Sequence, residues 1–128
     1  MAIELLHSEI TGPVIGAAME VHKIMGPGFL ESVYEEAFAI ELDLRNVSYK
    51  RQHPIDIFYK GKPAKHFICD FIIENLVVVE LKAISQLSDI EKAQILNYLK
   101  ATKLPVGLLL NFGAQSLEYK RFANTKSI

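Results

Sequence analysis

The chain has 128 residues, of which 50% are hydrophobic and 23% are charged, and 14 Lys and Arg against 15 Asp and Glu give it a net charge of −1. This composition is typical of a folded globular protein and excludes a disordered or fibrous chain. Its length predicts one domain over residues 1–128. Because the net charge is near zero, any binding of nucleic acid must rely on a local basic patch.

The chain has a single cysteine, Cys69, which excludes an intramolecular disulfide and a zinc site built on several cysteines. One cysteine in a chain of this size favours a reducing compartment. The N-terminus carries Glu4 where a secretion signal would carry basic residues. No uncharged stretch in the first half approaches the ~18 apolar residues of a membrane span. We therefore expect a cytoplasmic protein with no membrane partner.

Two helices are expected at the start of the chain. The first is predicted over residues 11–25, because the Thr11-Gly12-Pro13 segment places proline in a first turn, where it is tolerated. Gly26-Pro27-Gly28 is expected to end it, since proline cannot continue the hydrogen-bond ladder. Apolar residues at helical spacing, with acids between them, predict a second helix over residues 29–46.

Three strands are expected next. Residues 48–59 alternate between polar and apolar, and Tyr59-Lys60-Gly61-Lys62 predicts a hairpin turn into a strand over residues 64–73. A further turn follows at Glu74-Asn75. The valine-rich run over residues 76–81 is typical of a central strand that is covered on both faces.

The last part of the chain predicts one helix and two strands. Ser88-Asp89-Ile90-Glu91 has the form of a capping box, which predicts a helix that continues to about Thr102. A buried strand over residues 106–112 and an edge strand over residues 117–123 are expected after it. The resulting order α-α-β-β-β-α-β-β predicts an α/β (α+β) fold with a mixed central sheet flanked by helices.

The most informative polar residues are Asp70 on one strand and Glu80 and Lys82 on the next. Because side chains alternate along a strand, Glu80 and Lys82 point to the same face. A three-residue loop between the two strands would pair Asp70 with Glu80, whereas a two-residue loop would pair it with Val79. The two acids therefore meet only if the loop has three residues.

Two carboxylates that face each other repel unless a counter-charge lies near them. Lys82 offsets part of this repulsion, and Mg²⁺ or Mn²⁺ is the natural further partner, because a hard cation takes oxygen ligands and supports phosphodiester hydrolysis. Lys82 would then orient the attacking water or stabilise charge on the phosphate. The alternative is an ordinary acid and lysine on a solvent-facing strand, against which the valine run argues.

The segment Gly28-Phe29-Leu30-Glu31-Ser32-Val33-Tyr34 matches the pattern that names the GxxExxY protein family. Asp70, Glu80-x-Lys82 and Gln94-x-x-x-Tyr98 follow it in that family's order. Over nearly its whole length the chain thus resembles this family, which is placed in the PD-(D/E)XK nuclease superfamily. The resemblance implies a restriction-endonuclease-like α-β-β-β-α-β core, a divalent-metal site and phosphodiester hydrolysis as the ancestral chemistry.

The resemblance also implies roles for single residues. Asp70 and Glu80 match the metal ligands, and Lys82 matches the catalytic lysine. Glu31 matches the first-helix glutamate that completes the metal shell. Without the resemblance, Glu31 is interpreted as an acid in the first turn of a helix, where negative charge is favoured, and Tyr34 as a half-buried tyrosine.

Gln94 and Tyr98 resemble the additional helix motif of the RecB-like branch of the superfamily, and the resemblance adds them to the catalytic candidates. They lie one helical turn apart, so that both can reach one site. An ordinary polar helix face is the alternative.

Four other residues receive a structural interpretation. His22 lies on an apolar helix stripe and is interpreted as a packing residue. Cys69 neighbours the predicted ligand Asp70 but faces the other side of its strand, which favours the core over a nucleophile. Glu35 and Glu36 are interpreted as solvated surface residues.

A basic segment spans residues 47–67, where five positive side chains accompany one acid. On adjacent strands these side chains would form a phosphate-tracking surface next to the metal site. A solvated strand pair whose lysines protect an edge explains them equally well. The basic residues are Lys50, Arg51, Lys60, Lys62 and Lys65.

Three functions are compatible with this sequence. The first is a metal-dependent nuclease acting on DNA or RNA. The second is a catalytically silent module of the same fold that binds nucleic acid or a protein partner. The third is a structural or dimerising protein, which the high apolar content suggests. A small nuclease core has little surface for gripping a duplex, so a homodimer or a larger partner fits the first reading.

Overall fold

The computed structural model describes residues 7–124, in which helices and strands follow each other in the expected order. The N-terminal residues that argue against a secretion signal lie outside this range. No helix in residues 7–124 has the length and apolar character that crossing a membrane requires. The elements are α1 (Ser8–Met25), α2 (Glu31–Leu44), β1 (Tyr49–Tyr59), β2 (Lys62–Ile73), β3 (Val77–Lys82), α3 (Asp89–Thr102), β4 (Val106–Asn111) and β5 (Glu118–Ala123).

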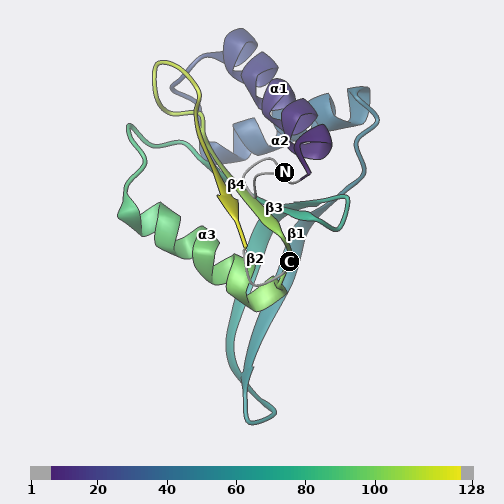
Figure 1. The fold of residues 1–128 in the computed structure, drawn as a ribbon. Helices are drawn as coiled ribbons and strands as arrows, with labels where there is room; N and C mark the ends of the chain where they lie inside the picture. Colours follow the sequence, from purple (N-terminus) through teal and green to yellow (C-terminus); the bar gives the residue numbers. More distant parts are fainter. Residues whose placement is uncertain (1–6, 125–128) are drawn as a thin grey trace.

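One sheet organises these elements, with the strand order β1-β2-β3-β4-β5. β3 and β4 are parallel, and all other neighbours are antiparallel. Helices α1 and α2 lie on one face of the sheet and α3 lies on the other (Figure 1). The expected mixed sheet flanked by helices is therefore confirmed, and the run from α2 to β4 has the order α-β-β-β-α-β.

Helix α1 begins at Ser8, three residues before the predicted start, so Pro13 lies inside the helix and not in its first turn. The prediction was wrong because it relied on proline alone as a start signal. Thr11 is buried and Ile10 packs against the core between the helices and the sheet. This burial favours one more helical turn, although Pro13 provides no N–H for the ladder.

The turn between α1 and α2 is held by the tyrosine of the GxxExxY segment. Tyr34 is fully buried, not half-buried, and its hydroxyl donates to the carbonyl of Gly26 and accepts from the N–H of Phe29. Gly26 and Gly28 have φ values of 68° and 112°, which favour glycine. These bonds keep residues 29 and 30 out of the helix, so α2 begins at Glu31, later than predicted.

Strand β3 is the central strand that its valine run predicts. Its first five residues are buried, and only Lys82 is partly exposed. The loop from β2 has three residues, and the register pairs Phe71 with Val79 and Ile73 with Val77. Continued by one residue, this register sets Asp70 opposite Glu80. The three-residue loop on which the site prediction depended is confirmed.

The hairpin of β1 and β2 is the longest feature of the sheet. It extends beyond the other strands and ends in a narrow tip (Figure 1). Lys60 and Gly61 form its two-residue turn, and both have a positive φ, at 49° and 76°. Such turns match the twist of the flanking strands. The hairpin turn predicted at this place is confirmed.

Replacing Tyr34 with phenylalanine tests whether the hydroxyl of Tyr34 stabilises the turn between α1 and α2. The variant keeps the buried ring but leaves the Gly26 carbonyl and the Phe29 N–H without their partner. We expect the free energy of unfolding to fall by about 1–3 kcal/mol in urea titrations. The same change at Tyr119, which is 44% exposed, is the control and should change little. Equal stability of the two variants would contradict this role of Tyr34.

Candidate active site

Asp70 and Glu80 lie where the ladder between β2 and β3 stops. The last paired residues are Phe71 and Val79, and beyond them the carboxylates replace the strand hydrogen bonds. Glu80 Oε1 accepts from the backbone N–H of Asp70 at 2.9 Å, and Asp70 Oδ2 accepts from the backbone N–H of Leu81 at 2.8 Å. Each acid is thus held by the strand that carries the other. The predicted pair is brought together, in a geometry that backbone groups dictate.

Burial makes this pair electrostatically unfavourable. Glu80 is only 4% exposed, and burial, followed by the charge of Asp70, raises its pKa to about 8. Burial also raises the pKa of Asp70, although the bond from the N–H of Leu81 opposes that shift. Near neutral pH the pair therefore tends to hold a proton unless another cation takes its place.

Lys82 is connected to helix α3. Its Nζ donates to Gln94 Oε1 at 2.8 Å, and Gln94 Nε2 donates to the hydroxyl of Tyr98 at 3.1 Å. Tyr98 is buried, and burial, followed by the charge of Glu80, raises its pKa to about 12. The sequence-predicted residues Lys82, Gln94 and Tyr98 therefore form one chain of contacts beside the acids.

The predicted capping box defines where helix α3 begins, and this start determines which side chains of α3 face Lys82. The Ser88 side chain accepts from the N–H of Ile90, while Glu91 accepts from the backbone N–H of Ser88 at 2.7 Å. Glu91 is therefore used in the cap, although it shares a helix face with Gln94. The turn that follows presents Gln94 to Lys82.

Glu31 begins helix α2 at the rim of this group and is exposed. Burial, followed by the charge of Asp70, raises its pKa, while Lys82 lowers it. Glu31 therefore interacts electrostatically with both. Within residues 7–124, no three His, Cys, Asp or Glu side chains are grouped closely enough to hold a metal ion together. Asp70 and Glu80 form a pair, and the role of Glu31 as a third ligand stays a prediction.

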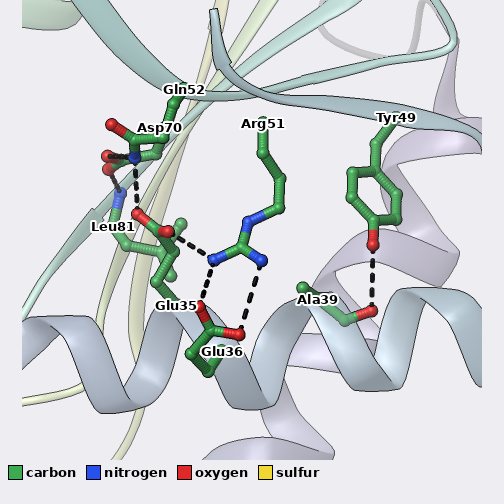
Figure 2. A network of polar contacts seen from close by, with 8 residues as sticks. All are labelled: Glu35, Glu36, Ala39, Tyr49, Arg51, Gln52, Asp70 and Leu81. Atoms are coloured by element: carbon green, nitrogen blue, oxygen red, sulfur yellow. Dashed lines mark hydrogen bonds and ion pairs between the residues drawn. The ribbon is translucent and has the colours of Figure 1, made fainter.

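Two further residues next to Asp70 were missed by the sequence analysis (Figure 2). Gln52 Nε2 donates to Glu35 Oε1 at 2.6 Å and lies 3.5 Å from Asp70 Oδ1. Gln52 has a φ of 48° within β1, a conformation that is strained for a residue with a side chain. The paired residues on either side of it set Gln52 opposite Asp70. The strain thus occurs at the carboxylate pair.

The interpretation of Glu35 as a solvated surface residue was wrong. Its side chain is 19% exposed and binds Arg51 at 2.6 Å, whereas Glu36 is 67% exposed, as predicted, and binds Arg51 at 2.8 Å (Figure 2). Glu35 lies one helical turn after Glu31, and this spacing was the available signal that both reach the same site. The pairing with a distant strand residue could not be seen in the sequence.

Arg51 changes the interpretation of the basic segment. Its guanidinium is shared between Glu35 and Glu36 and lies over the ring of Phe71, with 5.7 Å between the guanidinium carbon and the ring centroid. These carboxylates raise the pKa of Arg51. The charge of Arg51 is therefore balanced within the protein and is not presented to a phosphate. Arg51 therefore does not contribute to the basic surface that the sequence analysis expected beside the site.

The structural interpretations of two residues are confirmed. His22 is buried, and its Nε2 lies 2.9 Å from the carbonyl oxygen of Ala114. Cys69 is fully buried in the core beneath α3, and burial raises the pKa of its thiol to about 12. Such a thiol is a poor nucleophile.

Comparison with family models gives a match to the PD-(D/E)XK nuclease superfamily over residues 8–122. The chain belongs to this superfamily. Searches among curated proteins and among solved structures gave no match. The matched range runs from the first residue of α1 to one residue before the end of β5, and the PD-(D/E)XK membership agrees with the α-β-β-β-α-β order of the fold.

PD-(D/E)XK nucleases typically use divalent metals, and the carboxylates of this chain fit such an ion. Both carboxylates offer hard oxygen donors, as Mg²⁺ and Mn²⁺ prefer. The backbone bonds engage one oxygen of Asp70 and one of Glu80. A cation beside this pair would offset the burial of charge and the repulsion from Asp70, which together raise the pKa of Glu80.

Glu80→Gln should change how stability depends on pH. Because the pKa of Glu80 rises from near 4.5 to about 8, the folded protein holds a proton there that the unfolded chain releases. This contribution is present below about pH 4.5 and is lost as the pH rises to about 8. Without divalent ions, the wild type should lose about 4–5 kcal/mol more than the variant across this range.

Urea unfolding at several pH values measures this difference, and the Glu80→Gln side chain keeps an oxygen for the N–H of Asp70. The same change at exposed Glu9 is the control and should follow the wild type. Parallel pH profiles of the wild type and Glu80→Gln would mean that Glu80 does not hold the proton.

Proposed function

We propose that this protein is a divalent-metal-dependent nuclease that hydrolyses phosphodiester bonds in DNA or RNA. One observation carries the proposal, beyond superfamily membership: Asp70 and Glu80 are locked face to face by reciprocal backbone hydrogen bonds, with Lys82 next to them. The two acids satisfy backbone N–H groups, but uncharged Asn or Gln side chains would do the same without the repulsion that destabilises the fold, so the charged pair favours a cation site. A hydrolase needs such a pair.

Asp70 and Glu80 would hold Mg²⁺ or Mn²⁺ through the oxygens that remain available. When bound, the ion supplies a Lewis acid that polarises the phosphodiester and lowers the pKa of a water ligand. Glu31 adds negative charge at the rim of this site, in keeping with its electrostatic interaction with Asp70. The two directly held acids define the position of the ion, and Glu31 is a predicted further ligand.

Lys82 would stabilise negative charge on the phosphate or orient the attacking water. Gln94 keeps the Lys82 ammonium in place by accepting its hydrogen bond at 2.8 Å, and Tyr98 in turn fixes the amide of Gln94. The buried hydroxyl of Tyr98 stays protonated at neutral pH, because burial raises its pKa to about 12. Tyr98 would therefore position Gln94 and not act as a base.

Nuclease assays with variants of the two charged groups test this function. Asp70→Asn and Lys82→Gln should each lower the rate of Mg²⁺-dependent cleavage at least ~100-fold, since each removes charge that acts in the transition state. Lys100→Gln, an exposed lysine near the end of α3, is the matched control and should cleave as the wild type does. Cleavage that is indifferent to both site variants would rule out this active site.

Calorimetric titration with Mg²⁺ and with Mn²⁺ tests the metal site without a substrate. Near neutral pH, binding should release roughly one proton, seen as a heat that depends on the buffer, because the ion displaces the proton held by Glu80. Glu80→Gln should release none. A protein that binds nucleic acid in a salt-dependent way but neither binds metal nor cleaves would instead be the catalytically silent module.

A further inference from the structure

The outer half of the β1–β2 hairpin, residues 57–65, is here called the arm. β3 pairs with β2 only from Phe71 to Ile73, so the arm has no sheet neighbour outside its own two strands. Figure 1 shows it projecting away from the helices and the rest of the sheet. Every residue of the arm except Ile57 is exposed. It is a two-stranded ribbon with both faces and both edges in solvent.

The side chains of the arm differ in charge from the rest of the molecule. Residues 57–65 contain three lysines and no acid, whereas the whole chain has a net charge of −1. Two large aromatic side chains, Phe58 and Tyr59, are 60% and 67% exposed beside these lysines. Lysines alone would explain protection of a strand edge. Exposed aromatic residues do not serve that purpose and indicate a contact surface.

The arm begins on the same strand that carries the carboxylate Asp70. Lys65 precedes Asp70 by five residues and Lys62 precedes it by eight, which at about 3.3 Å per residue places their backbones roughly 16 and 26 Å away. His66 and the half-exposed Ile68 share the Asp70 face of β2, whereas strand alternation places Lys65 on the opposite face, where its Nζ lies 5.9 Å from the ring centroid of Phe67. The sequence analysis expected these lysines beside the metal site. The structure instead distributes them along the arm, at increasing distance from Asp70 and on both faces of the ribbon or at its turn.

These dimensions agree with those of a DNA duplex. At about 3.4 Å per base pair, Lys65 and Lys62 would reach phosphates roughly five to eight base pairs from the scissile bond. The major groove of B-DNA admits a two-stranded β-ribbon, whereas that of an RNA duplex is deep and narrow. Apolar side chains at the tip of a ribbon in this groove can contact base edges and thymine methyl groups.

We propose that the arm is a DNA-binding element that enters the major groove of duplex DNA beside the cleavage site. Lys60, Lys62 and Lys65 contact phosphates, and Phe58 and Tyr59 lie against the base edges. This inference rests on the proposed nuclease function and names its substrate class as duplex DNA. It also supplies the grip that a small core lacks.

Binding to a labelled DNA duplex of about 24 base pairs, measured by fluorescence anisotropy without divalent ions, tests the arm independently of cleavage. The triple variant Lys60→Gln, Lys62→Gln, Lys65→Gln should bind at least ~10-fold more weakly. The slope of log K against log salt should decrease by roughly 2.7, at about 0.9 for each phosphate that the variant no longer neutralises. Phe58→Ala with Tyr59→Ala should weaken binding but leave this slope unchanged.

A matched triple variant, Lys23→Gln, Lys100→Gln, Lys120→Gln, makes the same change in net charge at exposed positions outside the arm. It should bind as the wild type does. Thermal unfolding of the arm variants should be unchanged, because the altered side chains are exposed. Equal weakening in both triple variants, or an arm variant that binds DNA normally, would overturn the proposal. So would equal weakening on duplex RNA or single strands.

Cleavage assays in Mg²⁺ separate this inference from the function on which it rests. Asp70→Asn should abolish cleavage of duplex DNA and keep wild-type binding and salt slope. If the wild type cleaves and the arm variants bind normally, the arm proposal fails and the nuclease remains. If the arm variants bind poorly and the wild type never cleaves, the nuclease fails and the DNA-binding arm remains.

Discussion

The candidate site depends on one exchange of hydrogen bonds, in which two carboxylates take the place of the backbone ladder between β2 and β3. Where the ladder stops, the N–H groups of Asp70 and Leu81 would lack partners, and the side chains of Glu80 and Asp70 accept from them. An unpaired buried N–H is costly, so the bonds hold the acids together despite their repulsion. Satisfying the backbone and assembling the site are thus a single structural event.

The surroundings of the pair set its protonation and its rigidity. Valine-rich β3 excludes water from one side, which raises the pKa of Glu80, and Lys82 reaches α3 through Gln94. On the other side, strained Gln52 and half-buried Glu35 connect the pair to α2, and Arg51 balances the added acid (Figure 2). Elements from both faces of the sheet therefore converge on one point. Strain in such a place is typical of functional sites.

The GxxExxY segment combines two different tasks. Its tyrosine is a structural residue, because Tyr34 closes the turn between α1 and α2 and packs on Phe112. Its glutamate, Glu31, begins α2, where burial and then the charge of Asp70 raise its pKa. The turn controls where α2 begins, and that start places Glu31 and, one turn later, Glu35. Motif residues that never meet a substrate can in this way still determine the geometry of a site.

The order of the elements, the hairpin turn, the capping box and the opposition of Asp70 and Glu80 could all be predicted from the sequence. They depend on local patterns and on a short loop, which one stretch of chain determines. The boundaries of α1 and α2 were less accurate, because burial and the bonds of Tyr34 outweighed the local signals of proline and apolar spacing.

Only the tertiary structure decided which charges cancel and which stay exposed to a ligand. Arg51 looks like a member of a basic strip in the sequence, yet it is neutralised by Glu35 and Glu36 from a helix, while the lysines of the arm extend far from the acids. The sequence by itself determined the chemical groups and the strands that carry them. Which of these groups pair depends on how helix α2 packs against the β1–β2 hairpin. That packing brings together residues far apart in the chain, so no local sequence pattern predicts it.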